Sequence, residues 1–366
     1  MPVTLSERLR RRIALEGPIS FRDFMEAALY DPEEGYYSRG ARIGEAGDFA
    51  TSPSISPLFA RAVARQFRRG TAELDGPIDF VDAGAGSGEL LAELHAALAK
   101  EDPAFAARLR LTAIEKSRAA REALHRRGLP PGLRVLSGAE ELAPASVSGW
   151  IFSNELYDAL PVARVRSTPA GLEEMRVGAD PGGFGWVFAP ASEELHRHFE
   201  AQQVTLEPGQ VAEVSPEAPE LHRTLARALA HGSLVAFDYG HRARTLYHSL
   251  ARPNGTLAVH SAGRRAGNPL ENPGEVDLTA HVNWDELARA GEAEGLKTVE
   301  VVRQGAWLTR AGIFDLAGSE AEKWRAFRLV DPEGMGDQLS VLVQTRSERG
   351  ATSLTHSNPP IESGFE

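Results

Sequence analysis

The 366-residue sequence contains no cysteine. This absence excludes disulfide bonds, a thiolate nucleophile, and zinc or iron–sulfur sites that need Cys ligands. Lysine is scarce, because only four of the 40 basic residues are Lys, and the 51 acidic residues give a formal net charge of −11. Binding to a phosphate backbone needs clustered positive charge. We therefore expect no nucleic-acid partner, whereas the acidic balance leaves a cationic substrate open.

Long apolar runs are also missing. Leu234–Phe237 is one of the longest, far below the ~20 residues that span a bilayer, so we expect no membrane insertion. Residues 1–17 are Arg-rich but lack the apolar segment of a secretory signal, and the chain suits a bacterial cytoplasmic protein. Thr4 and Glu7 instead form a capping box that starts a helix. One stripe of this helix is apolar: Leu5, Leu9 and Ile13.

Short apolar runs alternate with amphipathic segments along the chain. The runs predicted as strands are residues 78–81, 109–114, 133–136, 150–152, 234–237, 298–302 and 339–344. The segments predicted as helices between them are residues 89–99, 117–127, 215–231 (with Ser215 as cap and Gly232 just past the end) and 285–294. This rhythm predicts an α/β fold with a parallel sheet and crossover helices.

The rhythm also predicts how the chain is divided. Residues 1–70 read as an N-terminal helical region with a turn-rich lid loop at Gly47–Pro53. Residues 71–345 read as the α/β domain, with a β-rich insertion at about 161–212. Residues 346–366 lack periodicity and are predicted to be a disordered tail.

A glycine-rich turn follows the first strand of the α/β domain. It runs from Asp82 through Gly84, Gly86 and Gly88 to Glu89. A dinucleotide-binding turn would have glycine at the position of Glu89, where a carboxylate would face pyrophosphate, and no Gly-Lys-Ser/Thr of a P-loop follows. An acidic residue before these glycines fits a cofactor with a positively charged end, such as S-adenosylmethionine.

Glu115 ends the second strand, where a carboxylate can accept hydrogen bonds from both ribose hydroxyls of an adenosine. Each feature alone has an ordinary explanation: a glycine turn can be purely structural, and a Glu at a strand end is usually solvated. Together, in this order, they indicate a cofactor site formed by Asp82, the three glycines and Glu115.

The fourth strand ends in a polar motif. Asn154 and Glu155 lie at its carboxyl end, where ligands of open α/β sheets bind. Asp158 follows three residues after Glu155, so both can face one way where the chain turns helical. A buried carboxylate pair is costly unless it meets a cation, which favours a guanidinium or ammonium substrate and makes these three the catalytic candidates. The alternative for Asp158 is a helix cap or an ion pair with an Arg.

Two further clusters are weaker signals. The irregular stretch 272–282 carries Glu275, Asp277 and His281, which form a candidate substrate loop or an ordinary surface turn. His196 and His198 alternate without a nearby third ligand, so we expect solvated surface histidines and no metal site.

Several segments occur together, in this order, in a known family. They are residues 17–37, 47–53, 82–88, 154–161, 213–216, 238–240, 272–281 and 304–308. Over about residues 16–344 the chain resembles the MidA-like family, whose eukaryotic members are the mitochondrial complex I assembly-factor methyltransferases.

The resemblance implies a class I, Rossmann-like methyltransferase that uses S-adenosyl-L-methionine. It implies methylation of arginine in a protein substrate, with a subunit of respiratory complex I as an example, and a homodimer is one option for the assembly. It assigns cofactor contact to Gly84, Gly86, Gly88 and Glu115. It also places the lid loop at the active site, with Asp48, Thr51 and Ser52 added to the cofactor-binding set.

The chain also departs from the family pattern. Ala306 stands where the family has a carboxylate, and Ala50 follows Phe49 where the family often has a larger residue. The segment Tyr239–Arg244 is basic where polar residues are expected. Two other functions stay open: a small-molecule O- or N-methyltransferase, and an assembly chaperone that binds the cofactor without catalysis.

Overall fold

The computed structural model describes residues 3–39, 56–127, 129–130, 132–261, 264–265 and 267–346. Three of the predicted site residues, Asp48, Thr51 and Ser52, lie outside the described residues, as do the rest of the lid loop and the tail from residue 347.

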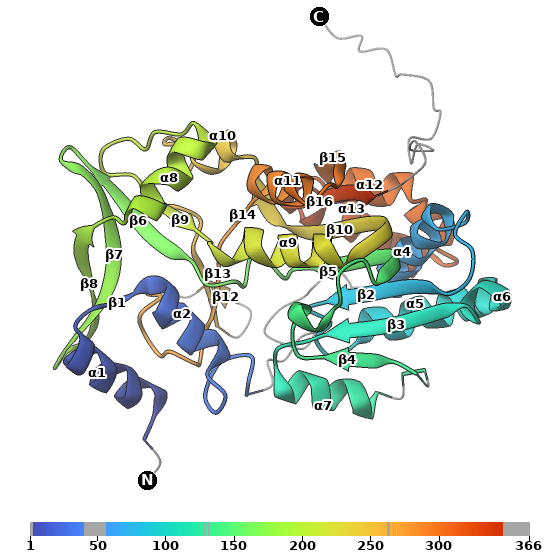
Figure 1. Ribbon diagram of the computed structural model, residues 1–366, viewed down its shortest axis with the longest axis horizontal. Coiled ribbons are helices and arrows are strands. Elements are labelled where there is room, and N and C mark those ends of the chain that lie inside the picture. The colour runs from blue at the N-terminus through green and yellow to red at the C-terminus, as the bar shows by residue number, and fades with distance from the viewer. Residues whose placement is uncertain are drawn as a thin grey trace, which may run out of the picture.

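A large central sheet, which lies on the right in Figure 1, forms the core of the α/β part of the molecule. Its strands lie in the order β15 (Lys297–Arg303), β16 (Leu339–Arg346), β10 (Leu229–His241), β5 (Val147–Asn154), β2 (Ile78–Ala83), β3 (Leu109–Ile114) and β4 (Arg134–Leu136). β16 is antiparallel to both its neighbours, and the other strands therefore run parallel to one another. The short strand β14 (Val282–Asn283) continues the sheet beside the end of β10. This is the Rossmann-like α/β fold predicted from the alternating pattern.

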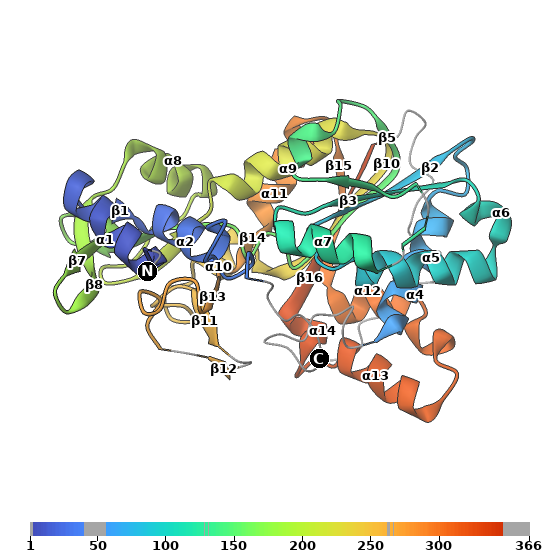
Figure 2. The same cartoon turned by 90° about the horizontal axis from the view of Figure 1, so that it is seen from below.

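Helices cover both faces of this sheet (Figure 2). On one face lie α4 (Pro57–Gly70), α5 (Glu89–Glu101), α12 (Gln304–Arg310) and α13 (Glu320–Val330), and on the other lie α9 (Glu217–Ala228) and α11 (Trp284–Ala293). Aromatic rings dominate the first layer: Phe59, Phe67, Phe80, Phe152 and Phe237 are fully buried. The shorter elements are α6 (Pro103–Ala106), α7 (Arg118–Arg126), α10 (Ala243–Leu246), α14 (Met335–Gln338), η1 (Ala139–Glu141) and η2 (Ile313–Leu316).

A second sheet joins the N-terminal region to the insertion. Its path is β1 (Ile19–Ser20), β7 (Gly171–Asp180), β6 (Ala163–Thr168) and β9 (Val211–Val214), and β8 (Gly183–Pro190) pairs with β7. Helices α1 (Leu5–Glu16) and α2 (Phe21–Tyr30) pack against it (Figure 1). A small third sheet is made of β12 (Arg264–Arg265), β11 (Ala258–Ser261) and β13 (Asp277–Thr279).

The insertion contains a helix that the strand-like pattern did not predict. α8 (Glu193–Gln202) starts at Ser192, whose side chain accepts the N–H of Leu195. Leu195 and Phe199, four residues apart, are its buried residues. The surrounding Gly and Pro residues and the alternation of apolar and polar residues favour strands, so the sequence pattern does not predict this helix.

Local signals gave mixed results at the helix ends. The capping box of α1 is confirmed, with the Thr4 hydroxyl accepting the Glu7 N–H and the Glu7 carboxylate accepting the Thr4 N–H. The predicted end of the helix at Gly232 is wrong, since α9 ends at Ala228 and Gly232 lies inside β10. A Cβ at Gly232 would lie 1.9 Å from the carbonyl oxygen of Gly149 on β5. This glycine therefore permits close strand approach.

In the described part of the chain, no helix combines the length and the apolar character needed to cross a bilayer.

Candidate active site

The glycine turn lies at the carboxyl edge of the central sheet, between β2 and α5. Gly84, Gly86 and Gly88 have φ angles of +80°, +53° and +80°, a region that other residues rarely adopt. A Cβ at Gly88 would also lie 2.4 Å from the Leu124 side chain. The turn therefore needs glycine, and the bare backbone it leaves forms one wall of a cavity.

Two acids flank this turn. Glu115 follows β3, and its carboxylate accepts the Gly86 N–H at 2.9 Å and the Ser117 N–H at 2.7 Å. Burial raises the pKa of Glu115 in spite of these bonds. Asp82 is buried within β2, where burial and then the charge of Glu115 raise its pKa to about 7. This acidic environment fits the positively charged end of a cofactor, which is the chemistry predicted from the sequence.

The cavity has a volume of about 1290 Å³, larger than the ~300–1,000 Å³ of most small-molecule sites. There is room for a nucleoside cofactor and for part of a second ligand beside it. Its lining residues come from strand ends far apart in the sequence and from the N-terminal region, and they include Gly84, Gly86, Glu115, Glu155, Tyr30 and Tyr37.

The motif after β5 forms a strained turn held by Asp238. Glu155 has a φ of +52°, which costs roughly 1–3 kcal/mol for a residue other than glycine. The Asp238 carboxylate accepts the N–H groups of Leu156 (3.1 Å), Tyr157 (2.8 Å) and Tyr239 (2.9 Å). These bonds offset the strain and fix the turn, from which Glu155 lines the cavity.

Asn154 and Asp158 flank Glu155 in different ways. The Asn154 amide donates to the Glu155 carboxylate at 2.9 Å and so orients it. Asp158 is buried and hydrogen-bonds to Asp238. Burial, and then the neighbouring carboxyl groups of Asp238, Glu155 and Asp277, raise the pKa of Asp158 well above its ordinary value. Among the described residues, Asp158 forms no ion pair with an Arg, in contrast to the alternative considered from the sequence.

The structure separates the residues of the predicted substrate loop. Asp277 is buried and accepts the Tyr37 hydroxyl at 2.9 Å. His281 is half-buried, and its ring stacks on that of Tyr239 with centroids 6.3 Å apart. Glu275 is exposed in a turn and does not line the cavity.

One of the two alternating histidines differs from expectation. His196 is exposed, as predicted. The side chain of His198 is only 7% exposed, so its prediction as a solvated residue is wrong. Its ring nitrogens lie 2.9 Å from the Tyr247 hydroxyl and 3.2 Å from the Glu286 carboxylate. Both partners are distant in sequence, which is why alternation alone could not reveal them.

Tyr30 and Tyr37 are cavity residues that the sequence analysis did not single out. Their rings stack with centroids 5.4 Å apart. The Tyr30 hydroxyl donates to the Ala159 carbonyl at 3.1 Å, and the Ser117 hydroxyl donates to the Tyr37 carbonyl at 2.8 Å. The N-terminal region is thereby tied to the carboxyl edge of the sheet. The Gly-Tyr-Tyr segment that ends at Tyr37 was the available signal.

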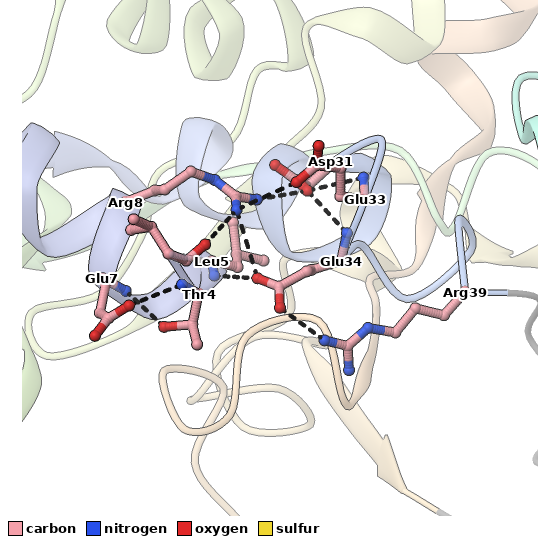
Figure 3. Close-up of polar contacts among 9 residues, drawn as sticks. Thr4, Leu5, Glu7, Arg8, Asp31, Glu33, Glu34 and Arg39 are labelled. Atoms are coloured by element: carbon pink, nitrogen blue, oxygen red, sulfur yellow. Dashed lines mark hydrogen bonds and ion pairs between the residues drawn. The ribbon is translucent and has the colours of Figure 1, made fainter. Parts of the chain in front are cut away.

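A polar network on α1 holds the segment that carries Tyr37 (Figure 3). Arg8 pairs with Asp31 at 2.7 Å. Glu34 accepts the Leu5 N–H and pairs with Arg39 at 3.3 Å. Because Arg39 also lines the cavity, this network links the first helix to the cavity wall.

Comparisons with known proteins agree with this geometry. A family model described as "Putative S-adenosyl-L-methionine-dependent methyltransferase" matches residues 58–302. The chain is 25% identical to the mitochondrial protein arginine methyltransferase NDUFAF7 of Rattus norvegicus, over 90% of this chain and 82% of that protein. It is 26% identical to the protein of the same name from Homo sapiens, over 85% of this chain and 74% of that protein.

The fold has a similar solved structure from Burkholderia thailandensis. That protein is described as a "likely methyl transferase" and is bound to S-adenosyl-homocysteine. The TM-score is 0.84 at 30% identity, covering 95% of this chain and 93% of that one. The glycine turn, its flanking acids and the size of the cavity fit the same kind of ligand, and the cofactor is S-adenosyl-L-methionine. The chain belongs to the MidA-like family of class I S-adenosyl-L-methionine-dependent methyltransferases.

Proposed function

We propose that this methyltransferase modifies an arginine side chain of a protein substrate. The observation that carries the proposal is the position of Glu155, a carboxylate oriented by Asn154 on the wall of a cavity that also contains the glycine turn. The names of the curated relatives, protein arginine methyltransferases, support the same substrate class. A subunit of respiratory complex I is the substrate suggested by the resemblance to the family.

Glu155 is suited to bind a guanidinium. Carboxylates bind this planar group through two parallel N–H bonds, and the Asn154 amide fixes the orientation of the Glu155 carboxylate. The stacked rings of Tyr30 and Tyr37 supply an aromatic wall on the N-terminal side of the same cavity. Arginine packs well on such surfaces, because its guanidinium is planar and weakly hydrated.

The chemistry needs little beyond alignment. S-adenosyl-L-methionine, when bound, supplies a methyl group on a sulfonium, which is a good leaving group. Orientation of the nucleophile can lower a barrier by about 7–11 kcal/mol, and Glu155 performs this role by fixing one guanidinium nitrogen. The guanidinium binds in its protonated form, because Arg is not deprotonated beforehand in proteins. The methylated nitrogen loses its proton afterwards, and Glu155 is the carboxylate positioned to accept it.

The proposal is tested by identifying the methylated residue. The protein is incubated with S-adenosyl-L-methionine labelled on the methyl group and with lysate from a strain that lacks the gene, and the labelled macromolecules are hydrolysed to amino acids. We expect the label in methylarginine. Label in another amino acid, or only in small molecules, would show that arginine is not the methylated group. No transfer at all would favour the non-catalytic chaperone.

A further inference from the structure

A cluster of basic side chains lies beyond the carboxylates of the candidate active site. One Arg252 guanidinium nitrogen is 2.5 Å from His241 Nε2, and the other donates to the Thr245 carbonyl at 2.8 Å. Arg303 ends β15 and donates to the Ser340 hydroxyl at 3.1 Å. His241, Arg252 and Arg303 are all half-buried. His241 belongs to the basic segment that departs from the family pattern.

The positive charge of this cluster is not compensated within the described residues. Neither Arg252 nor Arg303 forms an ion pair with a carboxylate there, although the whole chain has a net charge of −11. Arg242, in the same segment, shows the contrast, because it pairs with Asp285 at 2.9 Å. Burial and the neighbouring Arg303 lower the pKa of Arg252, as expected for two like charges held close together.

Histidine contributes hydrogen-bonding groups to the cluster rather than charge. The His241 and His281 rings lie 5.3 Å apart. Burial, then Arg252, His281 and Arg303, lower the pKa of His241 to about 3. At neutral pH His241 is therefore uncharged, and the charge of the cluster comes from the two guanidinium groups.

Tyr239 connects this cluster to the acidic residues. Its ring stacks on His281, and its other electrostatic neighbours are Glu155, Asp158 and Asp238, which together with burial raise its pKa. β15 runs parallel to β10, so Arg303 lies at the same carboxyl edge of the sheet as Glu155. The basic side chains lie outside the lining of the cavity that contains Glu155, so a polypeptide would have to extend along this edge of the sheet to contact both.

We propose that Arg252 and Arg303, flanked by His241 and His281, bind a carboxylate that lies near the target arginine in the polypeptide substrate. This inference rests on the proposed function and adds a specificity rule to it, namely an acidic residue close to the methylated arginine. Guanidinium groups bind carboxylates through charge-assisted hydrogen bonds. A carboxylate brings a single negative charge next to Glu155 and Asp158, whereas a phosphate group brings up to two and is repelled more strongly.

The first test measures substrate preference. Peptides with one central arginine carry Asp at each position from −3 to +3 in turn, and each is matched with the Asn peptide. In the wild type, Asp at one or more of these positions is expected to raise kcat/KM roughly tenfold or more over Asn, mainly through KM. In Arg252→Gln and Arg303→Gln this Asp/Asn ratio is expected to fall toward one. In the matched control Arg242→Gln, whose guanidinium is already paired, it is expected to stay at the wild-type value.

The second test measures carboxylate binding without methyl transfer. N-acetyl-aspartate amide is titrated into the protein saturated with S-adenosylhomocysteine, and the ring signals of His241 and His281 are followed by NMR. A saturable shift is expected that N-acetyl-asparagine amide does not produce and that is lost in Arg252→Gln. Binding of S-adenosylhomocysteine to each variant reports whether it is folded.

The outcomes separate the two proposals. Arginine peptides methylated equally with Asp and Asn would overturn the carboxylate subsite and leave arginine methylation standing. An absence of methylation in every arginine peptide, with a saturable Arg252-dependent shift, would count against arginine as the substrate and support the carboxylate site. No shift with the aspartate probe would overturn the site.

Discussion

His222 is fully buried and holds the middle of a chain of hydrogen bonds. Its Nδ1 lies 2.8 Å from the Tyr157 hydroxyl and its Nε2 lies 2.8 Å from Gln344 Oε1. Tyr157 belongs to the turn that carries Glu155, so this imidazole supports that turn. Burial lowers the His222 pKa to about 4, which means that the folded protein contains the neutral ring.

The His222 pKa predicts how stability depends on pH. Between pH 6.5 and 4 the unfolded chain binds a proton at this residue and the folded protein does not, so the contribution of His222 to stability falls as pH falls through this window. Buried acids such as Asp82, whose pKa is raised, contribute with the opposite sign. The shift from 6.5 to about 4 corresponds to about 3 kcal/mol. Urea unfolding at pH 7, 6, 5 and 4 measures how the free energy of unfolding depends on pH, and the difference between the wild type and His222→Gln should change by about 3 kcal/mol between pH 7 and pH 4. An unchanged pH dependence in the variant would show that His222 is not the titrating group.

The hydroxyls of Tyr37 and Tyr30 have different acceptors and should contribute differently to the free energy of unfolding. Tyr37→Phe leaves the buried Asp277 carboxylate without this donor, and we expect the free energy of unfolding to fall by roughly 1–3 kcal/mol. Tyr30→Phe loses a bond to a neutral carbonyl, for which about 1 kcal/mol is expected. Denaturant unfolding of both variants measures the difference, and an equal loss in the two would contradict it.

Among the elements, the pairing of β10 with β5 depends on two facing glycines. Gly232 has a φ of +113°, and the Cβ of any other residue would overlap the Gly149 carbonyl. Both strands carry residues of the site at their carboxyl ends, so their spacing fixes the site geometry.

Gly232→Ala is therefore expected to lower the free energy of unfolding by roughly 3 kcal/mol or more, because the backbone must shift or strain. Gly185→Ala in β8 is a matched control, since a Cβ there meets no atom within 4 Å, and a change within about 1 kcal/mol is expected. Equal stability of the two variants in denaturant titrations would contradict this account of the strand spacing.

The sequence predicted elements well where local signals act alone. β3 was predicted with its observed bounds, and the capping box of α1 was found, because strand periodicity and cap chemistry are encoded over a few residues. The end of α9 was missed, since Gly232 serves a neighbouring strand that is distant in sequence. α8 was not predicted because a ten-residue helix inside a segment with a strand-like pattern gives only a weak local signal.

On the scale of the whole molecule, the cavity is lined by the central sheet and by the N-terminal region. The glycine turn and Glu115 come from the central sheet, whereas Tyr30 and Tyr37 come from the N-terminal region that also completes the second sheet. The sequence motifs predicted the sheet side of this cavity. They did not predict that Tyr30 lies against Ala159, because this contact spans 129 residues.

Cofactor binding should therefore stabilise both the sheet side and the N-terminal side of the cavity. S-adenosylhomocysteine at 100 times its Kd is expected to raise the free energy of unfolding by about 2.7 kcal/mol. Hydrogen exchange should slow at residues 30–37 as well as at residues 84–88. Protection confined to the glycine turn would show that the N-terminal wall does not take part in binding.

The central claim is that Glu155 holds the guanidinium of an arginine substrate, and its most direct test is the rate of methyl transfer by Glu155→Gln. The assay uses saturating S-adenosyl-L-methionine and, as acceptor, the protein that the labelling experiment identifies. We predict that Glu155→Gln methylates it at a rate at least 100-fold below that of the wild type. The Kd of S-adenosylhomocysteine should stay within about threefold, and Glu207→Gln, at an exposed position remote from the cavity lining, should match the wild type. A Glu155→Gln protein that methylates arginine at the wild-type rate would contradict the account.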